Sequence, residues 1–495
     1  MLELLHYKVL FPWLLGMVFG IFVGATPGLT ATMAVALIVP LSIKLGPTAG
    51  LALIIGVSFT AIFAGDIPAT FLRIPGTPAS AAATLDGHAL AKKGRGGLAM
   101  SLDLFCSSIG GLVGVALLIF SAQWLAKFAL QFSNFEMFWL GVLGLSLSAV
   151  VTQGSTFKGI IAASLGLLIA TVGLDSTSGV TRYSFGLIDL SRSTDEFVIP
   201  AMIGLFGLSE VLRSVHRPAG ALGATVAPSA RLPLGEALRT IWRYKRTVLQ
   251  SAGIGTVIGA LPGAGADIAA WGAYGIARKT SRRPDEFGTG SEEGVVAPTS
   301  ANNAAVAGAW IPALVFGVPG DAVTAIVLGA LIMYGITPGP NIFRDSGDQV
   351  HQLFAIAVIT QFLLLPAGYL GIKAFSVMLR LPRAVVLSAV VLFSVVGAYA
   401  VNNTMFDVYV MVAFGLLGFF LELRGVPMPP LVLGLILGGM IETKLRAGLI
   451  LSKGDPTPFF TRPICMALIV VLVAVLAGGP FVRLLSRRIF RRSAV

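Results

Sequence analysis

Charged side chains are scarce in this sequence. Asp, Glu, Lys and Arg make up 12% of its 495 residues, against about 25% in a typical soluble domain, while 56% are hydrophobic. This composition excludes a soluble globular enzyme, a disordered chain and a fibrous protein. It also disfavours a transmembrane β-barrel, whose strands alternate polar and apolar residues. An all-α polytopic membrane protein remains, because helices satisfy their own backbone hydrogen bonds in lipid.

Cysteine and histidine are scarce as well. The two cysteines, Cys106 and Cys465, lie in separate apolar segments, and the four histidines are scattered along the chain. Neither residue type has the spacing of a zinc or haem site. We therefore expect no bound metal and no cofactor.

The sequence patterns of membrane enzymes are missing too. It has no Gly-x-x-x-x-Gly-Lys-[Ser/Thr] loop for an ATPase, and no Ser–His pair stands out within the apolar runs. The nearest patterns to an intramembrane aspartyl protease, Ala-Gly-Asp at 64–66 and Gly-Ala-Asp at 265–267, lack the Gly-x-Gly-Asp arrangement of such enzymes. We expect no catalytic residues and keep the protease only as the weakest alternative.

The basic residues indicate topology. The net charge is +12, and the Lys and Arg residues lie between apolar runs, which is typical of cytoplasmic loops and does not suggest a nucleic-acid partner. The segment 213–246 carries seven of them against one acid, Glu236. Its Leu234, Leu238 and Ile241 recur at helical spacing, which predicts an interfacial helix on the membrane. A solvated basic linker fits this pattern equally well.

Eleven apolar runs are clear candidates for membrane spans, each of which needs about 20 residues. Shorter runs broken by Gly and Pro bring the expected total to about 12 transmembrane helices. We predict a first membrane half at 1–212, a basic cytoplasmic linker with the interfacial helix at 213–246, a second membrane half at 247–482 and a basic cytoplasmic tail at 483–495.

The two halves contain matching motifs. Residues 20–35 and 255–270 are identical at seven of sixteen positions, at an offset of 235 residues. Residues 67–81 and 311–325 are identical at six of fifteen positions, at an offset of 244 residues. Two motif pairs in the same order indicate an internal duplication.

Each matching motif contains a Pro-Gly pair within an apolar stretch. The pairs are Pro27-Gly28, Pro75-Gly76, Pro262-Gly263 and Pro319-Gly320. Proline lacks a backbone donor and glycine permits non-helical dihedral angles, so such a pair breaks a helix. Interrupted helices in corresponding positions of two repeats point to a transporter binding site, where the restarting helices favour an anion. A plain kink or surface turn is the alternative at any single pair.

Three acids lie in these motifs and are candidates for the coupling ion. Intramembrane Asp66, Asp267 and Asp321 could bind a cation or carry a proton. Each also has a structural alternative: Asp321 as a helix N-cap, Asp267 as an acid near a helix start, and Asp66 as a surface partner of Arg73. Asn302 and Asn303 could contact the substrate or ion, or satisfy the backbone of a broken helix.

Four segments carry a family resemblance. The segments GATPG, IPGTPASAAATLDGHALAKKG (74–94), GALPGAGAD and PTSANNAAVAGAWIPALVFGVPGDAV (298–323) resemble, in this order, the large permease subunit of the tripartite tricarboxylate transporter family. The resemblance covers about residues 15–440. It implies a multi-pass protein of the bacterial inner membrane with an inverted repeat and Pro-Gly-broken re-entrant helices. It also implies two partners, a periplasmic substrate-binding protein and a small four-helix membrane subunit.

The resemblance further implies import of a di- or tricarboxylate or a related organic anion, driven by a Na⁺ or H⁺ gradient. Asp66 and Arg73 depart from the family pattern, and Arg73 could clamp a carboxylate. An ion or solute channel, or a sensor subunit, also fits duplication with helix breaks. The residues expected at the substrate are Pro27, Gly28, Thr30, Arg73, Pro75, Gly76, Thr77, Pro262, Gly263, Gly265, Asn302, Asn303, Pro319 and Gly320.

Overall fold

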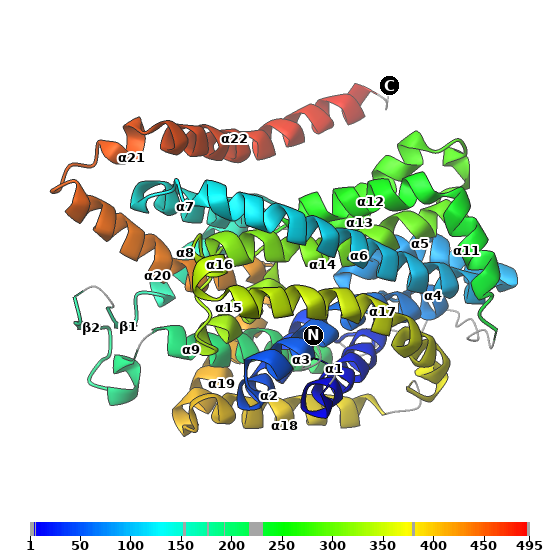
Figure 1. Ribbon diagram of the computed structural model, residues 1–495, viewed down its shortest axis with the longest axis horizontal. Helices are drawn as coiled ribbons and strands as arrows, with labels where there is room; N and C mark the ends of the chain where they lie inside the picture. The colour runs from blue at the N-terminus through cyan, green and yellow to red at the C-terminus, as the bar shows by residue number, and fades with distance from the viewer. Residues whose placement is uncertain are drawn as a thin grey trace. The chain divides into compact units, whose positions relative to one another are not determined.

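The computed structural model describes residues 4, 6–151, 155–175, 178–192, 194–216, 231–378 and 382–492. Within these ranges helices make up nearly all regular structure (Figure 1). Nine helical stretches in the described part of the chain are long and apolar enough to cross a membrane. The predicted all-α polytopic membrane fold is therefore confirmed. The count of about 12 and the re-entrant helices stay predictions, because four further apolar helices are shorter than a full span.

The chain forms two compact units. The first comprises Met1–Ala126, Ile199–Ala260 and Ala264–Phe419, and the second comprises Lys127–Val198, Leu261–Gly263 and Phe420–Val495. Each unit draws residues from both sequence halves, so the halves at 1–212 and 247–482 describe the predicted repeat and not the compact units.

The helices of the first unit include most of the predicted spans. Their bounds are α1 Tyr7–Ala25, α2 Ala31–Leu45, α3 Pro47–Ala64, α4 Asp66–Leu72, α5 Ala81–Leu90, α6 Gly96–Ala129, α9 Thr194–Met202, α10 Ser209–His216, α11 Leu234–Arg243, α12 Lys245–Gly259, α13 Gly265–Thr280, α14 Glu292–Phe316, α15 Ala322–Met333, α16 Ile342–Asp345, α17 Gly347–Met378, α18 Arg383–Asn402 and α19 Met405–Leu423, of which α6, α9 and α19 extend past the limits of the unit.

Glycines let α1 and α3 pack at close range. A Cβ atom at Gly20 would overlap the backbone of Val57, and a Cβ atom at Gly24 would overlap the carbonyl oxygen of Ala61. Small residues spaced four apart let two helix backbones approach closely in a membrane protein. The helix pair is therefore specified by this glycine stripe.

The same arrangement joins α12 and α14. Gly255 lies against the carbonyl group of Ala301, and Gly259 lies against that of Ala305. The glycines are 235 residues beyond those of α1, and the alanines are 244 residues beyond the contact residues of α3. Because these are the offsets of the two sequence motifs, both halves of the chain build the same helix pair.

The second unit contains α7 Asn134–Val151, α8 Thr156–Ile169, α20 Met428–Leu451, α21 Pro458–Thr461 and α22 Pro463–Arg492. Helices α7, α8 and α20 pack on one another, and α22 packs on α7. Strands β1 Gly173–Leu174 and β2 Thr181–Arg182 form an antiparallel pair. The guanidinium group of Arg182 contacts Glu442 of α20 at 2.7 Å, which ties the strand pair to that helix.

Helix α11 is the helical part of the segment expected to be interfacial. It buries Ala237 and Ile241 and exposes Trp242, whose ring is covered by the ammonium group of Lys245. Arg95 bridges Glu236 of α11 and Glu292 of α14 at 2.7 and 2.8 Å. Residues 217–230, which include Arg217, lie outside the described residues. An interfacial position of α11 and the cytoplasmic location of 213–246 and 483–495 stay predictions.

Candidate functional site

The first Pro-Gly pair separates α1 from α2. Helix α1 ends at Ala25, and Gly28 has a φ of +91°, which side-chain-bearing residues rarely adopt. The hydroxyl group of Thr30 then accepts the backbone N–H of Met33 at 3.1 Å and so caps α2. A neutral residue therefore caps the N-terminus of α2, which leaves the positive end of its helix dipole uncompensated.

The second pair lies beyond α4. This helix ends at Leu72, and the next residue, Arg73, has a φ of 59°, in the left-handed region. The backbone N–H of Gly76 donates to the carbonyl oxygen of Gly65 at 3.0 Å. A Cβ atom at Gly76 would overlap the carbonyl oxygen of Gly24, so the break seats its backbone against the end of α1. Thr77 is buried, whereas Pro75 is exposed.

The corresponding break in the second half has the same contact. Helix α14 ends at Gly317, and Pro319-Gly320 follows it. A Cβ atom at Gly320 would overlap the carbonyl oxygen of Gly259 at the end of α12. Gly24 and Gly259 differ by 235 residues, and Gly76 and Gly320 differ by 244. In both halves, the glycine of the Pro-Gly break packs against the C-terminal end of an equivalent helix, which is α1 in the first half and α12 in the second.

The remaining pair, Pro262-Gly263, belongs to the second compact unit. Gly263 has a φ of +80°, and a Cβ atom there would overlap Ser148 of α7. Gly265, at the start of α13, also has a positive φ, of 66°. The backbone is therefore broken where the sequence predicted, while a substrate role for Pro262, Gly263 and Gly265 stays a prediction.

A buried polar cluster joins α4, α6 and α14. Asp66 begins α4, and its Oδ2 accepts a hydrogen bond from Nδ2 of Asn302 at 3.1 Å. Asp103 of α6 contacts the carboxyl group of Asp66 and accepts the hydroxyl group of Ser107 at 3.1 Å. Asn303 donates from Nδ2 to the backbone carbonyl oxygen of Ser107 at 3.4 Å. All five side chains are almost fully buried.

Asp103 was not among the residues predicted for the site. This acid lies in the apolar run 98–121, where the rule that intramembrane acids are functional candidates applies as it does to Asp66. The surface pairing with Arg73 does not occur, because Asp66 is 1% exposed and its side-chain partners in the described chain are Asn302, Asp103 and Ser80. The predicted residues Asp66, Asn302 and Asn303 are thus brought together around an acid that was not predicted.

The other two predicted acids lie at the starts of helices. Asp321 caps α15: its carboxylate accepts the backbone N–H of Thr324 at 2.8 Å, and the hydroxyl of Thr324 accepts the N–H of Asp321 at 3.0 Å. This reciprocal pair is a capping box, the structural alternative expected for Asp321. Asp267 lies in the first turn of α13, where the helix dipole favours an acid.

Arg73 is exposed, and it forms no salt bridge among the residues that the structure describes. Arg73 belongs to the irregular backbone segment that follows α4, two residues before Pro75-Gly76. An exposed guanidinium group at a helix break is suited to bidentate contact with a carboxylate.

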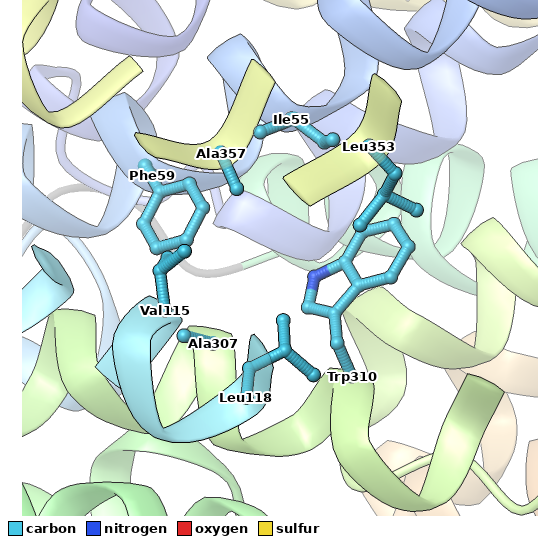
Figure 2. A pocket seen from close by; sticks show the side chains of 8 residues that line it. All are labelled: Ile55, Phe59, Val115, Leu118, Ala307, Trp310, Leu353 and Ala357. Atoms are coloured by element: carbon cyan, nitrogen blue, oxygen red, sulfur yellow. The ribbon is translucent and has the colours of Figure 1, made fainter. Parts of the chain in front are cut away.

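A small pocket in the first unit is lined by apolar side chains, with Phe59 and Trp310 facing it from opposite sides (Figure 2). Its other lining residues are aliphatic and come from α3, α6, α14 and α17. A carboxylate needs charged or hydrogen-bonding partners, which this lining does not offer. The pocket is thus not a candidate for the substrate site.

The fold and these breaks define a polytopic membrane protein with discontinuous helices, an arrangement found at the binding sites of secondary transporters. The chain belongs to the tripartite tricarboxylate transporter TctA family, whose sequence model matches residues 10–433. The members of this family are transporter subunits and not enzymes. This confirms the prediction that the chain is the large membrane subunit of a tripartite tricarboxylate transporter. A tripartite system implies two further subunits.

Two relatives come from Agrobacterium vitis. An uncharacterized 52.8 kDa protein in the TAR-I ttuC' 3' region is 33% identical over 477 residues, which cover 96% of this chain and 94% of that protein. An uncharacterized protein in the TAR-II ttuC' 3' region is 39% identical over 215 residues, which cover 43% of this chain and 89% of that protein. No solved structure matches this chain.

Proposed function

We propose that this chain is the membrane permease of a binding-protein-dependent secondary transporter in the bacterial inner membrane. It imports an organic anion, a di- or tricarboxylate or a related acid, and a Na⁺ or H⁺ gradient drives the uptake. A periplasmic substrate-binding protein delivers the anion, and a small four-helix membrane subunit completes the complex. The family membership supports the transporter class.

The observation that carries the proposal is the contact of Gly76 with Gly24 and of Gly320 with Gly259. Each break leaves backbone N–H and C=O groups without helical partners. Such groups are tolerated at membrane depth only where protein or a wet cavity surrounds them. Two equivalent breaks give the permease two matching elements whose relative movement opens the site first to one side and then to the other.

An anionic substrate suits the first half better than the second. Helix α2 begins with the neutral cap Thr30, whereas α15 begins with the carboxylate of Asp321, which already compensates the dipole of that helix. Arg73 supplies an exposed positive charge in the first half as well. We therefore assign the carboxylate of the substrate to the N-terminus of α2 and to Arg73.

The proposal is tested by uptake of labelled carboxylates into source cells with and without the gene for this chain. External Na⁺ and pH are varied in the same assay. We expect at least one carboxylate to accumulate only when the chain is present and only with a gradient. Saturation with substrate separates a carrier from a channel, whose flux rises without a turnover limit. Uptake that is independent of the chain for every carboxylate under every gradient contradicts the proposal.

A further inference from the structure

We propose that Asp66 and Asp103 share one proton and form the site of the coupling ion, so that the ion is H⁺ and not Na⁺. This inference rests on the proposed function, because a coupling ion presupposes transport along a gradient. It adds Asp103, a residue outside the predicted site, and it selects between the two candidate ions.

The carboxyl groups of the two acids contact one another. Asp66 and Asp103 are each 1% exposed, and their carboxyl groups lie within hydrogen-bonding distance of one another. Two carboxylates at such a separation cannot both be ionised unless a positive charge lies between them. A proton on either group turns it into a donor to the other, and the pair then titrates as a unit.

Hydrogen-bond donors satisfy only part of the pair. Oδ2 of Asp66 accepts from Asn302, and Oδ1 of Asp103 accepts from Ser107, both at 3.1 Å. The hydroxyl group of Ser80 faces Asp66, but Oδ1 of Asp66 and Oδ2 of Asp103 accept no hydrogen bond of good geometry from the described residues. Each acid thus keeps one oxygen that can share a proton with the other acid. One shared proton provides the missing donor for the pair, and buried acceptors without a donor are costly.

The described residues place no countercharge beside the pair. Neither acid has a salt-bridge partner in the ranges that the structure covers. The groups that face the pair are Ser80 before α5, Asn302 of α14, and Ser107 and the thiol of Cys106 on α6. All of these are neutral in their ordinary state. No fixed cation therefore holds the pair in its doubly ionised form.

An independent observation comes from Asn303. This residue is fully buried, and its Oδ1 has no hydrogen-bond donor in the described part of the chain. Its Nδ2 donates to Ser107, the residue whose hydroxyl group binds Asp103. The amide thus leaves one more buried acceptor without a donor in this cluster. The cluster as a whole has more acceptors than donors, as a site for a proton requires.

The direct contact favours a proton over a metal cation. A bound Na⁺ holds oxygen atoms around itself and would separate the two carboxyl groups, whereas a proton draws them together. The second half lacks the counterpart of Asp66, because the residue 244 positions further along the chain is Trp310. The geometry thus gives one coupling proton for each chain.

The transport test uses the complete complex in membrane vesicles, with labelled succinate and citrate as probes. Asp103→Asn keeps the shape of the pair. Its amide group can donate a hydrogen bond to Asp66 but cannot release or take up a proton. We expect this variant to lose uptake driven by an acidic exterior but to keep the exchange of labelled for unlabelled probe, which needs no net proton movement. Asp345→Asn, which changes an exposed acid paired with Arg344, is the matched control and should keep both activities.

Two results of the transport test overturn the proposal. One is proton-driven uptake in Asp103→Asn at the wild-type rate. The other is wild-type uptake that follows Na⁺ at constant pH. In both cases the transporter assignment still stands.

An infrared measurement decides the proposal even where neither probe is transported. If the two acids share a proton, the infrared spectrum of the purified wild-type complex at neutral pH should contain an absorption band from the carbonyl stretch of a buried, protonated carboxyl group. This band should be lost in the double variant Asp66→Asn and Asp103→Asn and should remain in Asp345→Asn. A wild-type complex without the band overturns the shared proton. A band together with absent transport of every carboxylate contradicts the proposed function and leaves the carboxyl pair in place.

Discussion

The hydroxyl group of Tyr274 on α13 donates a hydrogen bond of 2.9 Å to Oδ2 of Asp86 on α5. Oδ1 of the same carboxylate accepts the backbone N–H groups of Gly288, Gly290 and Ser291 at 2.8 to 2.9 Å. Asp86 is fully buried. The carboxylate of Asp86 therefore binds the loop between α13 and α14 to α5. Asp86 is the acid of the TLDGHALAKKG segment, and its role is structural.

Replacing this carboxylate should destabilise the protein strongly. Asp86→Ala leaves three backbone N–H groups without their acceptor, and we expect a loss of about 3 kcal/mol in the free energy of unfolding. Thermal unfolding in detergent measures the change. Tyr274→Phe removes a single hydrogen bond and should have a smaller effect. Asp285→Ala, an exposed acid in the same loop, is the control, and an equal melting temperature for Asp86→Ala and this control contradicts the role.

Alanine at the two equivalent breaks should abolish transport. The added methyl group of Gly76→Ala or Gly320→Ala overlaps a backbone carbonyl oxygen of α1 or α12, which cannot move aside as a side chain can. We expect the two variants to lose carboxylate uptake to a similar extent, because the contacts are equivalent. Expression in the membrane is measured alongside uptake.

Gly275→Ala is the matched control for this pair. A Cβ atom at Gly275 meets no neighbour within 4 Å, and glycine is unfavourable within a helix. This change should keep uptake and stabilise α13 by about 1 kcal/mol. Wild-type uptake in Gly76→Ala or Gly320→Ala would show that the breaks tolerate displacement, against the proposed function.

The sequence was sufficient to find the breaks because proline and glycine disrupt a helix whatever surrounds them. It also predicted the repeat at offsets of 235 and 244 residues, which recur in the contacts of Gly76 and Gly320. The helix breaks and the repeat depend on the local backbone conformation, which can be predicted from a short sequence pattern. The cap at Asp321 was among the alternatives for the same reason.

The partners of buried acids could not be predicted in this way. Asp66 and Asp103 are 37 residues apart, and Asp86 binds a loop 202 to 205 residues further along the chain. A carboxylate that holds backbone N–H groups and one that needs a proton look alike in a sequence. Their difference lies in the number of donors that the folded chain brings to each, which only the tertiary structure determines.

Replacing Arg73 should weaken substrate binding without unfolding the protein. Asn adopts the left-handed backbone of this position with little strain, so Arg73→Asn should melt as the wild type does. The loss of the guanidinium group should raise the KM for the carboxylate about tenfold, equal to about 1.4 kcal/mol. Initial uptake rates over a range of concentrations measure it. Arg283→Asn, at an exposed arginine paired with Glu286, is the control, and equal KM values in the two variants remove Arg73 from the substrate site.

Two substitutions of Asp321 distinguish a role in helix capping from a role in ion coupling. Asp321→Asn keeps a side-chain oxygen that can accept the N–H of Thr324 but removes the charge, so the cap should survive. Asp321→Ala removes the cap and should cost about 1 kcal/mol in the free energy of unfolding. If the acid only caps α15, uptake in Asp321→Asn will keep the wild-type dependence on the gradient, in contrast to Asp103→Asn. A gradient dependence lost in Asp321→Asn while its melting temperature stays unchanged would instead make Asp321 part of the coupling site.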